Sequence, residues 1–216
     1  MSLRAFALAA ALPGCALVPP RVGEPPPVLA DADAERAYRA VLEASSARAE
    51  IYAGLDSRAF VGMTWQSAAF REARTRREAA FGNWPAGALQ AALERERAVA
   101  GSSEEFLLGV HVEDRRYDDF DRPGSAWRLV LEGPGGVEVM PSSVERVGRV
   151  GLPLRALYPY LGEFWVAYRV RFPARDEAGR AVLQDAGRGF TVKLGSALGQ
   201  AKLAFPASAE AEPRGR

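Results

Sequence analysis

Few side chains in this chain could carry covalent or metal chemistry. The sequence has one cysteine, Cys15, and one histidine, His111. A structural zinc site needs four ligands and a catalytic one usually three, so these two residues cannot make a Cys/His zinc site. The motifs of nucleophile elbows, P-loops, zinc peptidases and dinucleotide sites are also absent from the sequence. We therefore predict no cofactor and no catalytic residues.

His111 and the acidic segment 113–121 are the two remaining candidates for chemistry. His111 alternates with apolar neighbours, so we expect it on a strand face outside the core, where it makes ordinary polar contacts. The acidic segment holds four aspartates, which are hard oxygen ligands of the kind that Ca²⁺ prefers. Arg115, Arg116 and the adjacent Arg122 offset that charge, and the spacing is not that of an EF-hand. We predict a solvated loop without a metal.

Cys15 lies in a context that is typical of an exported protein. Arg4 precedes an uncharged apolar run over 5–12, and Gly14 comes directly before the cysteine. A run of this length is too short to span a bilayer, which needs about 20 apolar residues. An exported domain usually pairs its cysteines, and the sequence offers Cys15 no partner. The thiol is therefore expected to serve another purpose.

The segment Leu12-Pro13-Gly14-Cys15 resembles the lipobox of bacterial lipoproteins. Leu12, Gly14 and Cys15 match that pattern, whereas Pro13 departs from it. The resemblance covers only the first fifteen residues. It implies that 1–14 is a signal peptide and that the Cys15 thiol carries diacylglycerol. Because Ala16 rather than Asp follows, it also implies an outer membrane lipoprotein that faces the periplasm, with surface exposure left open.

The rest of the chain divides into a tether, one domain and a tail. Residues 15–30 are the expected tether, because five prolines within 19–27 favour an extended polyproline II strut. Residues 31–205 are a usual size for a single domain. Residues 206–216 are expected to be a disordered tail. The net charge is +1, and Asp and Glu are interleaved with the arginines, so we predict no nucleic-acid partner.

Helical patterns are confined to the first half of the domain. Asp31 and Asp33 are good N-caps for a helix that we expect to run to about Ala49. Residues 51–65 alternate as a strand hairpin would, with a continuous helix as the alternative. Residues 67–101 predict a helical hairpin inserted between strands.

From residue 104 onward, apolar side chains recur at every second position. The pattern is clear in 106–112, and clearest in 164–172. Short strands with one apolar face each predict two sheets that pack on each other. The predicted fold is mainly β, an immunoglobulin-like antiparallel β-sandwich with an N-terminal helix and the helical insert.

An aromatic segment, 154–165, is expected to contribute mainly to the core, and it is also the best candidate for a partner surface. Its large side chains are Tyr158, Tyr160, Phe164 and Trp165. We predict a non-catalytic binding or assembly module that holds an envelope protein or cell-wall component at the membrane. A hydrolase that uses carboxylates is the alternative. The arginines of 71–77 are expected to form a solvated helix face, or else to touch anionic lipid.

Overall fold

The computed structural model describes residues 26–99, 101–183 and 186–207. Within these ranges the chain forms nine strands and four α-helices, with two 3₁₀ turns. Cys15 and the predicted signal peptide lie outside the described residues, as does most of the predicted tail. The mainly β character of the fold, with two antiparallel sheets, is confirmed.

The larger sheet has five strands in the order β1-β2-β3-β7-β6, and the smaller sheet has four in the order β5-β4-β8-β9. All of the pairings are antiparallel. The strands of the first sheet are β1 (Ser46–Ala53), β2 (Asp56–Trp65), β3 (Ser103–Val112), β7 (Val166–Pro173) and β6 (Ser143–Arg149). Those of the second are β5 (Glu138–Val139), β4 (Arg128–Glu132), β8 (Phe190–Ser196) and β9 (Gly199–Phe205).

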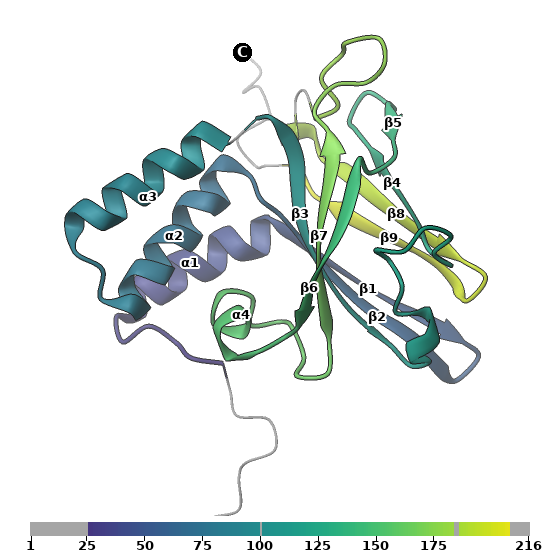
Figure 1. Cartoon of the computed structure of the whole chain (residues 1–216), viewed down its shortest axis with the longest axis horizontal. Coiled ribbons are helices and arrows are strands. Elements are labelled where there is room, and N and C mark those ends of the chain that lie inside the picture. Colours follow the sequence, from purple (N-terminus) through teal and green to yellow (C-terminus); the bar gives the residue numbers. More distant parts are fainter. Residues whose placement is uncertain (1–25, 100, 184–185, 208–216) are drawn as a thin grey trace, which may run out of the picture.

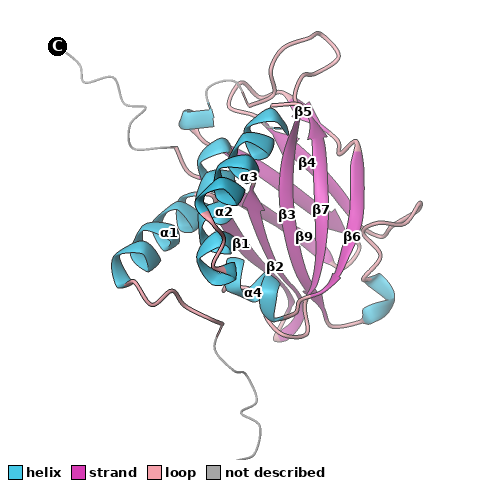
Figure 2. Ribbon diagram, turned by 60° about the vertical axis from the view of Figure 1, so that its left-hand side comes forward, coloured by secondary structure: helices cyan, strands magenta, loops and turns pink. Residues whose placement is uncertain are grey.

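The molecule has three layers, because helices cover the face of the five-stranded sheet that is turned away from the small sheet (Figure 1). The helices are α1 (Ala32–Ala44), α2 (Ala68–Gly82), α3 (Ala86–Val99) and α4 (Leu152–Leu157). Figure 2 shows that they lie over one half of the sheet and leave the side of β6 uncovered. The pocket that contains Phe164, described below, lies beside β6.

The main core fills the space between the two sheets. Period-two alternation sends Phe106, Leu108 and Val110 of β3 into it, and all three are buried, as the sequence predicted. Leu131 and Val192 meet them from the small sheet. Along one side, β1 lies next to β9, so the sandwich is closed there. A smaller core under α1, α2 and α4 holds the helical layer on the sheet.

The hairpin predicted for 51–65 is present, but it begins earlier than expected. The helix predicted to reach Ala49 ends at Ala44, because residues 46–53 pair with β2 instead. This pairing buries Ala47 and Ile51 against the main core, and that packing outweighs the helix propensity of a segment rich in Ala, Arg and Glu. The reversal occurs at residues 54–55, where Gly54 adopts φ +65°.

The predicted helical insert of 67–101 corresponds to α2 and α3. The Ser67 side chain caps α2 by accepting a hydrogen bond from the Phe70 N–H at 3.1 Å. One strand, β6, was not predicted at all. Its side chains are mostly exposed because it is an edge strand, so its sequence shows no period-two pattern.

Candidate functional site

Tyr158 belongs to the interior of the fold, and Tyr160 is partly buried beside it. The side chain of Tyr158 is only 2% exposed, and its hydroxyl donates to the Gln66 Oε1 at 3.2 Å. The hydroxyl of Tyr160 shares a hydrogen bond of 2.6 Å with Thr64 Oγ1. The prediction that Tyr158 forms part of a partner surface is therefore corrected: burial makes this ring unavailable to a partner.

A pair of glycines explains how the aromatic segment packs. Gly62 of β2 and Gly109 of β3 lie opposite each other in register, on the face covered by the segment. A Cβ on Gly62 would lie 2.5 Å from the ring of Tyr160, and one on Gly109 would lie 3.3 Å from that of Trp165. The missing side chains leave a depression that these rings occupy. Trp165 is consequently half-buried.

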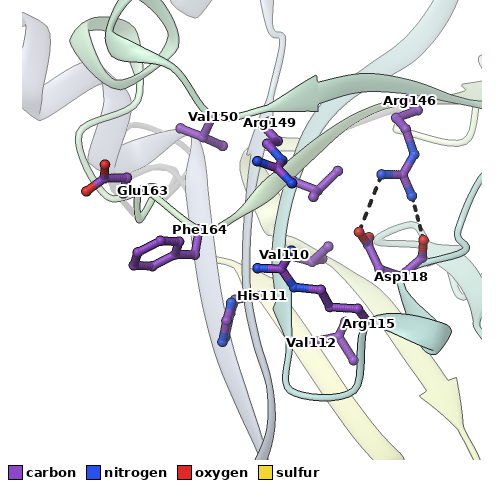
Figure 3. Close-up of a pocket in the computed structure, with 11 residues that line it drawn as sticks. Val110, His111, Val112, Arg115, Asp118, Arg146, Arg149, Val150, Glu163 and Phe164 are labelled. Atoms are coloured by element: carbon purple, nitrogen blue, oxygen red, sulfur yellow. Dashed lines mark hydrogen bonds and ion pairs between the residues drawn. The ribbon is translucent and has the colours of Figure 1, made fainter.

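Phe164 differs from the other three aromatic residues because its side chain is 70% exposed. It lies at the rim of a cavity of about 410 Å³, which we name the Phe164 pocket (Figure 3). The pocket is lined by residues of β3, β6, the loop after β3 and the loop before β7. Those used below are His111, Val112, Arg115, Arg149, Glu163 and Phe164.

The floor of the pocket next to β6 is a network in which charges are already paired. Arg146 donates to the hydroxyl of Tyr168 at 2.6 Å and forms ion pairs with Asp118 at 3.4 Å and Asp121 at 3.6 Å. Tyr168 in turn donates to Asp118 Oδ1 at 2.5 Å. Burial and this hydrogen bond raise the pKa of Tyr168. The pKa of Arg146 is raised overall: desolvation lowers it, but Tyr168, Asp118 and Asp121 raise it by more. Arg146 therefore stays charged, and the two aspartates neutralise its charge.

Arg115 and Arg149 stand in contrast to Arg146. Within the described ranges, no hydrogen bond or ion pair engages either guanidinium group. Both groups extend into the space between β3 and β6, whereas the Glu163 carboxylate points away from them (Figure 3). The pocket thus offers two uncommitted cations from two different elements. Guanidinium forks are well suited to carboxylate and phosphate oxygens.

The backbone of β3 is also open at the pocket. The main-chain groups of Glu105 and Glu113 form hydrogen bonds on the β2 side of the strand. Because these groups alternate in direction along an antiparallel strand, the main-chain N–H and C=O of even-numbered residues point toward β7. However, β7 starts at Val166, which pairs with Val110. The main-chain N–H and C=O of Val112 therefore point beyond the end of β7, on the side where the pocket lies.

His111 lies where the alternation placed it, on the face of β3 away from the main core. Its ring is 6.2 Å from that of Phe60, centroid to centroid, and it lines the Phe164 pocket. In the described part of the chain, no group of three or more His, Cys, Asp or Glu residues is arranged to hold a metal ion.

The aspartates of the acidic segment are occupied by local partners. Asp114 accepts from Arg116 at 2.5 Å, and Asp119 accepts from Ser125 at 3.1 Å and from the Ala126 N–H at 3.2 Å. Asp118 and Asp121 belong to the Arg146 network described above. The carboxylates thus point to different partners rather than to one centre.

The arginines of α2 do not form the solvated face, or the lipid contact, that the sequence suggested. Arg77 is only 1% exposed and pairs with Glu35 at 2.6 Å. Arg71 is also buried and pairs with Glu96 at 2.9 Å, while Arg76 alone is clearly exposed. The correction has a simple cause, since α2 is packed between other helices and the sheet, so most of its faces meet protein.

The predicted aromatic segment includes Phe164 of the pocket, but the two pocket arginines were not predicted as site residues. Arg149 lies in the unpredicted strand β6, and Arg115 was read as a counter-charge for its own loop. Within the described residues, no helix is long and apolar enough to cross a bilayer.

Comparisons with known proteins add one similarity. No protein-family model matches the chain, and no curated protein matches it. A solved structure described as a novel protein of unknown function from Burkholderia pseudomallei is similar over 83% of this chain and 86% of its own. The identity is 10% and the TM-score is 0.42, a level of similarity that carries no argument about fold or function.

Proposed function

We propose that the chain is an envelope lipoprotein, anchored through Cys15 in the outer membrane, whose domain faces the periplasm. In this proposal the domain is a non-catalytic module that binds an envelope protein or cell-wall component. The membrane part of the proposal is supported by the Leu12 to Cys15 segment alone. The immunoglobulin-like form of the sandwich also belongs to the proposal, supported by two sheets that share one core, with the helical layer as an addition.

The observation that carries the binding function is the Phe164 pocket. An exposed aromatic ring beside two uncommitted guanidinium groups has the composition of binding hot spots, in which aromatic residues and arginine are enriched. Arg149 is held on β6, and Arg115 and Phe164 lie in the short segments that directly follow β3 and precede β7, so packed strands fix the position of the site.

The carboxylate hydrolase receives less support. Such enzymes need two carboxylates on either side of the scissile bond, one of which is free to donate a proton. At the pocket, Asp118 already accepts hydrogen bonds from Tyr168 and Arg146, and Glu163 points away from the two unpaired arginines. The two carboxylates are therefore not placed as the acid and base of a hydrolase.

Metabolic labelling with a radioactive fatty acid tests the anchor. The wild type should be labelled and the Cys15→Ser variant should not. An unlabelled wild type with an uncleaved signal peptide would contradict the anchoring.

Cross-linking in intact cells tests the binding module. Phe164→Ala should lose a partner that the wild type retains, while Leu55→Ala, which truncates an exposed apolar side chain at the tip of the first hairpin, should keep it. Recovery of the same partner by Phe164→Ala, or turnover of a glycan, peptide or ester by the purified protein, would overturn the proposal.

A further inference from the structure

The two uncommitted arginines of the Phe164 pocket offer charged donors to an anionic ligand group. Arg115 follows β3 and Arg149 ends β6, so the sheet brings together two cations from distant parts of the sequence. Arg146, the next cation along, is already neutralised by Asp118 and Asp121. An anion entering the pocket would therefore meet the guanidinium groups of Arg115 and Arg149 rather than those of the paired network.

The pocket also has an apolar part. The exposed ring of Phe164 and the side chains of Val150 and Val166 border the same cavity as the two arginines. Its volume of about 410 Å³ lies in the lower part of the usual range for ligand sites, roughly 300–1,000 Å³. It is large enough for an anionic group together with an apolar one.

The open main chain of β3 distinguishes between ligand classes. Val112 presents one donor and one acceptor past the end of β7, which is how a sheet accepts an added extended strand. A peptide can satisfy both groups. A phosphate headgroup offers acceptors but no donor for the carbonyl, and a membrane surface would favour a broad basic face rather than a notch in a sheet.

We infer that the Phe164 pocket captures the C-terminal carboxylate of an extended peptide with an apolar last residue. The carboxylate binds Arg115 and Arg149, the last side chain packs on Phe164, and the peptide main chain pairs with Val112. This inference rests on the proposed binding function and specifies the chemistry of its partner.

The test compares two peptides on the purified full-length protein. The probe is a fluorescein-labelled hexapeptide that ends in valine and phenylalanine, with either a free carboxylate or a C-terminal amide, and binding is followed by fluorescence anisotropy. The free acid should bind at least about tenfold more tightly than the amide, because hydrogen bonds to charged groups contribute about 1.5–3 kcal/mol. Equal binding of the two peptides, or no binding of either, would overturn the inference.

Variants locate the site. Arg115→Gln and Arg149→Gln should each weaken the acid about tenfold and leave the amide unchanged. Arg95→Gln is the matched control, because Arg95 is an exposed arginine on α3, away from the pocket. Neither pocket arginine supports another side chain in the described structure, so the unfolding midpoint should not change.

Two further outcomes separate this inference from the proposed function. The first outcome is displacement of the labelled peptide by anionic phosphatidylglycerol vesicles, to the same extent as by the unlabelled free-acid peptide. That result would show that the pocket binds a lipid headgroup, and the inference would be wrong. If the Arg115→Gln, Arg149→Gln double variant keeps the partner that Phe164→Ala loses in cells, the binding module stands but carboxylate capture does not.

Discussion

Replacing Arg77 with methionine is expected to destabilise the domain by about 3–5 kcal/mol. The guanidinium group of Arg77 lies inside the helical layer, where it donates to Glu35 at 2.6 Å and to the Ala156 carbonyl at 2.7 Å. It also lies over the ring of Tyr38, 4.3 Å from its centroid. Methionine retains the apolar stem but leaves the Ala156 carbonyl without the Arg77 donor and the Glu35 carboxylate without its buried cationic partner, which is the costly part of the change.

The pKa of Glu35 reflects the same interaction, together with two other hydrogen bonds. Desolvation raises this pKa, but hydrogen bonds from Arg77, the Leu29 N–H and Arg39 outweigh it and lower the value from 4.5 to about 2. At about 1.4 kcal/mol for each tenfold change in proton affinity, this lowering corresponds to about 3 kcal/mol of folding free energy. Because the folded pKa is the lower one, the contribution is complete above pH 4.5 and is lost as the pH falls toward 2.

Urea unfolding followed by tryptophan fluorescence measures both effects. Arg77→Met and Glu35→Gln should each lower the free energy of unfolding at pH 7, and the advantage of the wild type over Glu35→Gln should decline between pH 4.5 and pH 2.5. Glu72→Gln is the matched control, because Glu72 pairs with Arg76 on the exposed side of α2 and should contribute at most about 0.5 kcal/mol. A cost below about 1 kcal/mol for Arg77→Met, or an advantage that does not change with pH, would refute this reasoning.

Three further predictions follow from local packing and charge. Gly109→Ala should destabilise the domain by about 1–3 kcal/mol in the same urea assay, because its Cβ would overlap the aromatic segment. Gly87→Ala in α3 has free space and should stabilise the domain by up to about 1 kcal/mol. Equal effects of the two substitutions would contradict the packing argument. Tyr160→Phe should cost about 1 kcal/mol through its lost hydrogen bond to Thr64, and thermal unfolding by circular dichroism would show a lower midpoint. Calorimetric titration with Ca²⁺ should give no tight binding, because the aspartates of 113–121 already have other partners. Tight binding that Asp118→Asn abolishes would show that the segment is a metal site.

The strand alternation could be predicted from sequence where one face of a strand meets the core. In β3, Phe106 to Val112 alternate because the inter-sheet core demands it, and the pattern was sufficient to predict two packed sheets. In β6 no face is buried, so nothing in 143–149 distinguishes it from a loop. Because β6 was not predicted, the position of Arg149 in the sheet could not be predicted either.

The helical layer shows a different limit of sequence reasoning. Arg71 and Arg77 look like surface residues by type, and only the positions of Glu96 and Glu35 in the fold reveal that they are buried and paired. The strand glycines are the sequence signal for the buried aromatic segment, because Gly62 and Gly109 each mark a close approach of another segment. Placing these two glycines opposite each other on neighbouring strands predicts that another part of the chain covers them.

The contacts of Arg77 also have a mechanical consequence for a tethered protein. The Pro27 carbonyl accepts from Arg77 at 3.3 Å, and the Leu29 N–H donates to Glu35 at 2.9 Å, so the end of the predicted tether is fastened to the helical layer. If Cys15 is the anchor, residue 26 lies eleven positions along the chain from it, and at about 3.6 Å per residue this length of chain can reach no farther than roughly 40 Å. A pull on the tether would therefore enter the domain beside the Arg77 to Glu35 ion pair, which joins α2 to α1. This point of attachment lies in the helical layer, apart from the residues that line the Phe164 pocket.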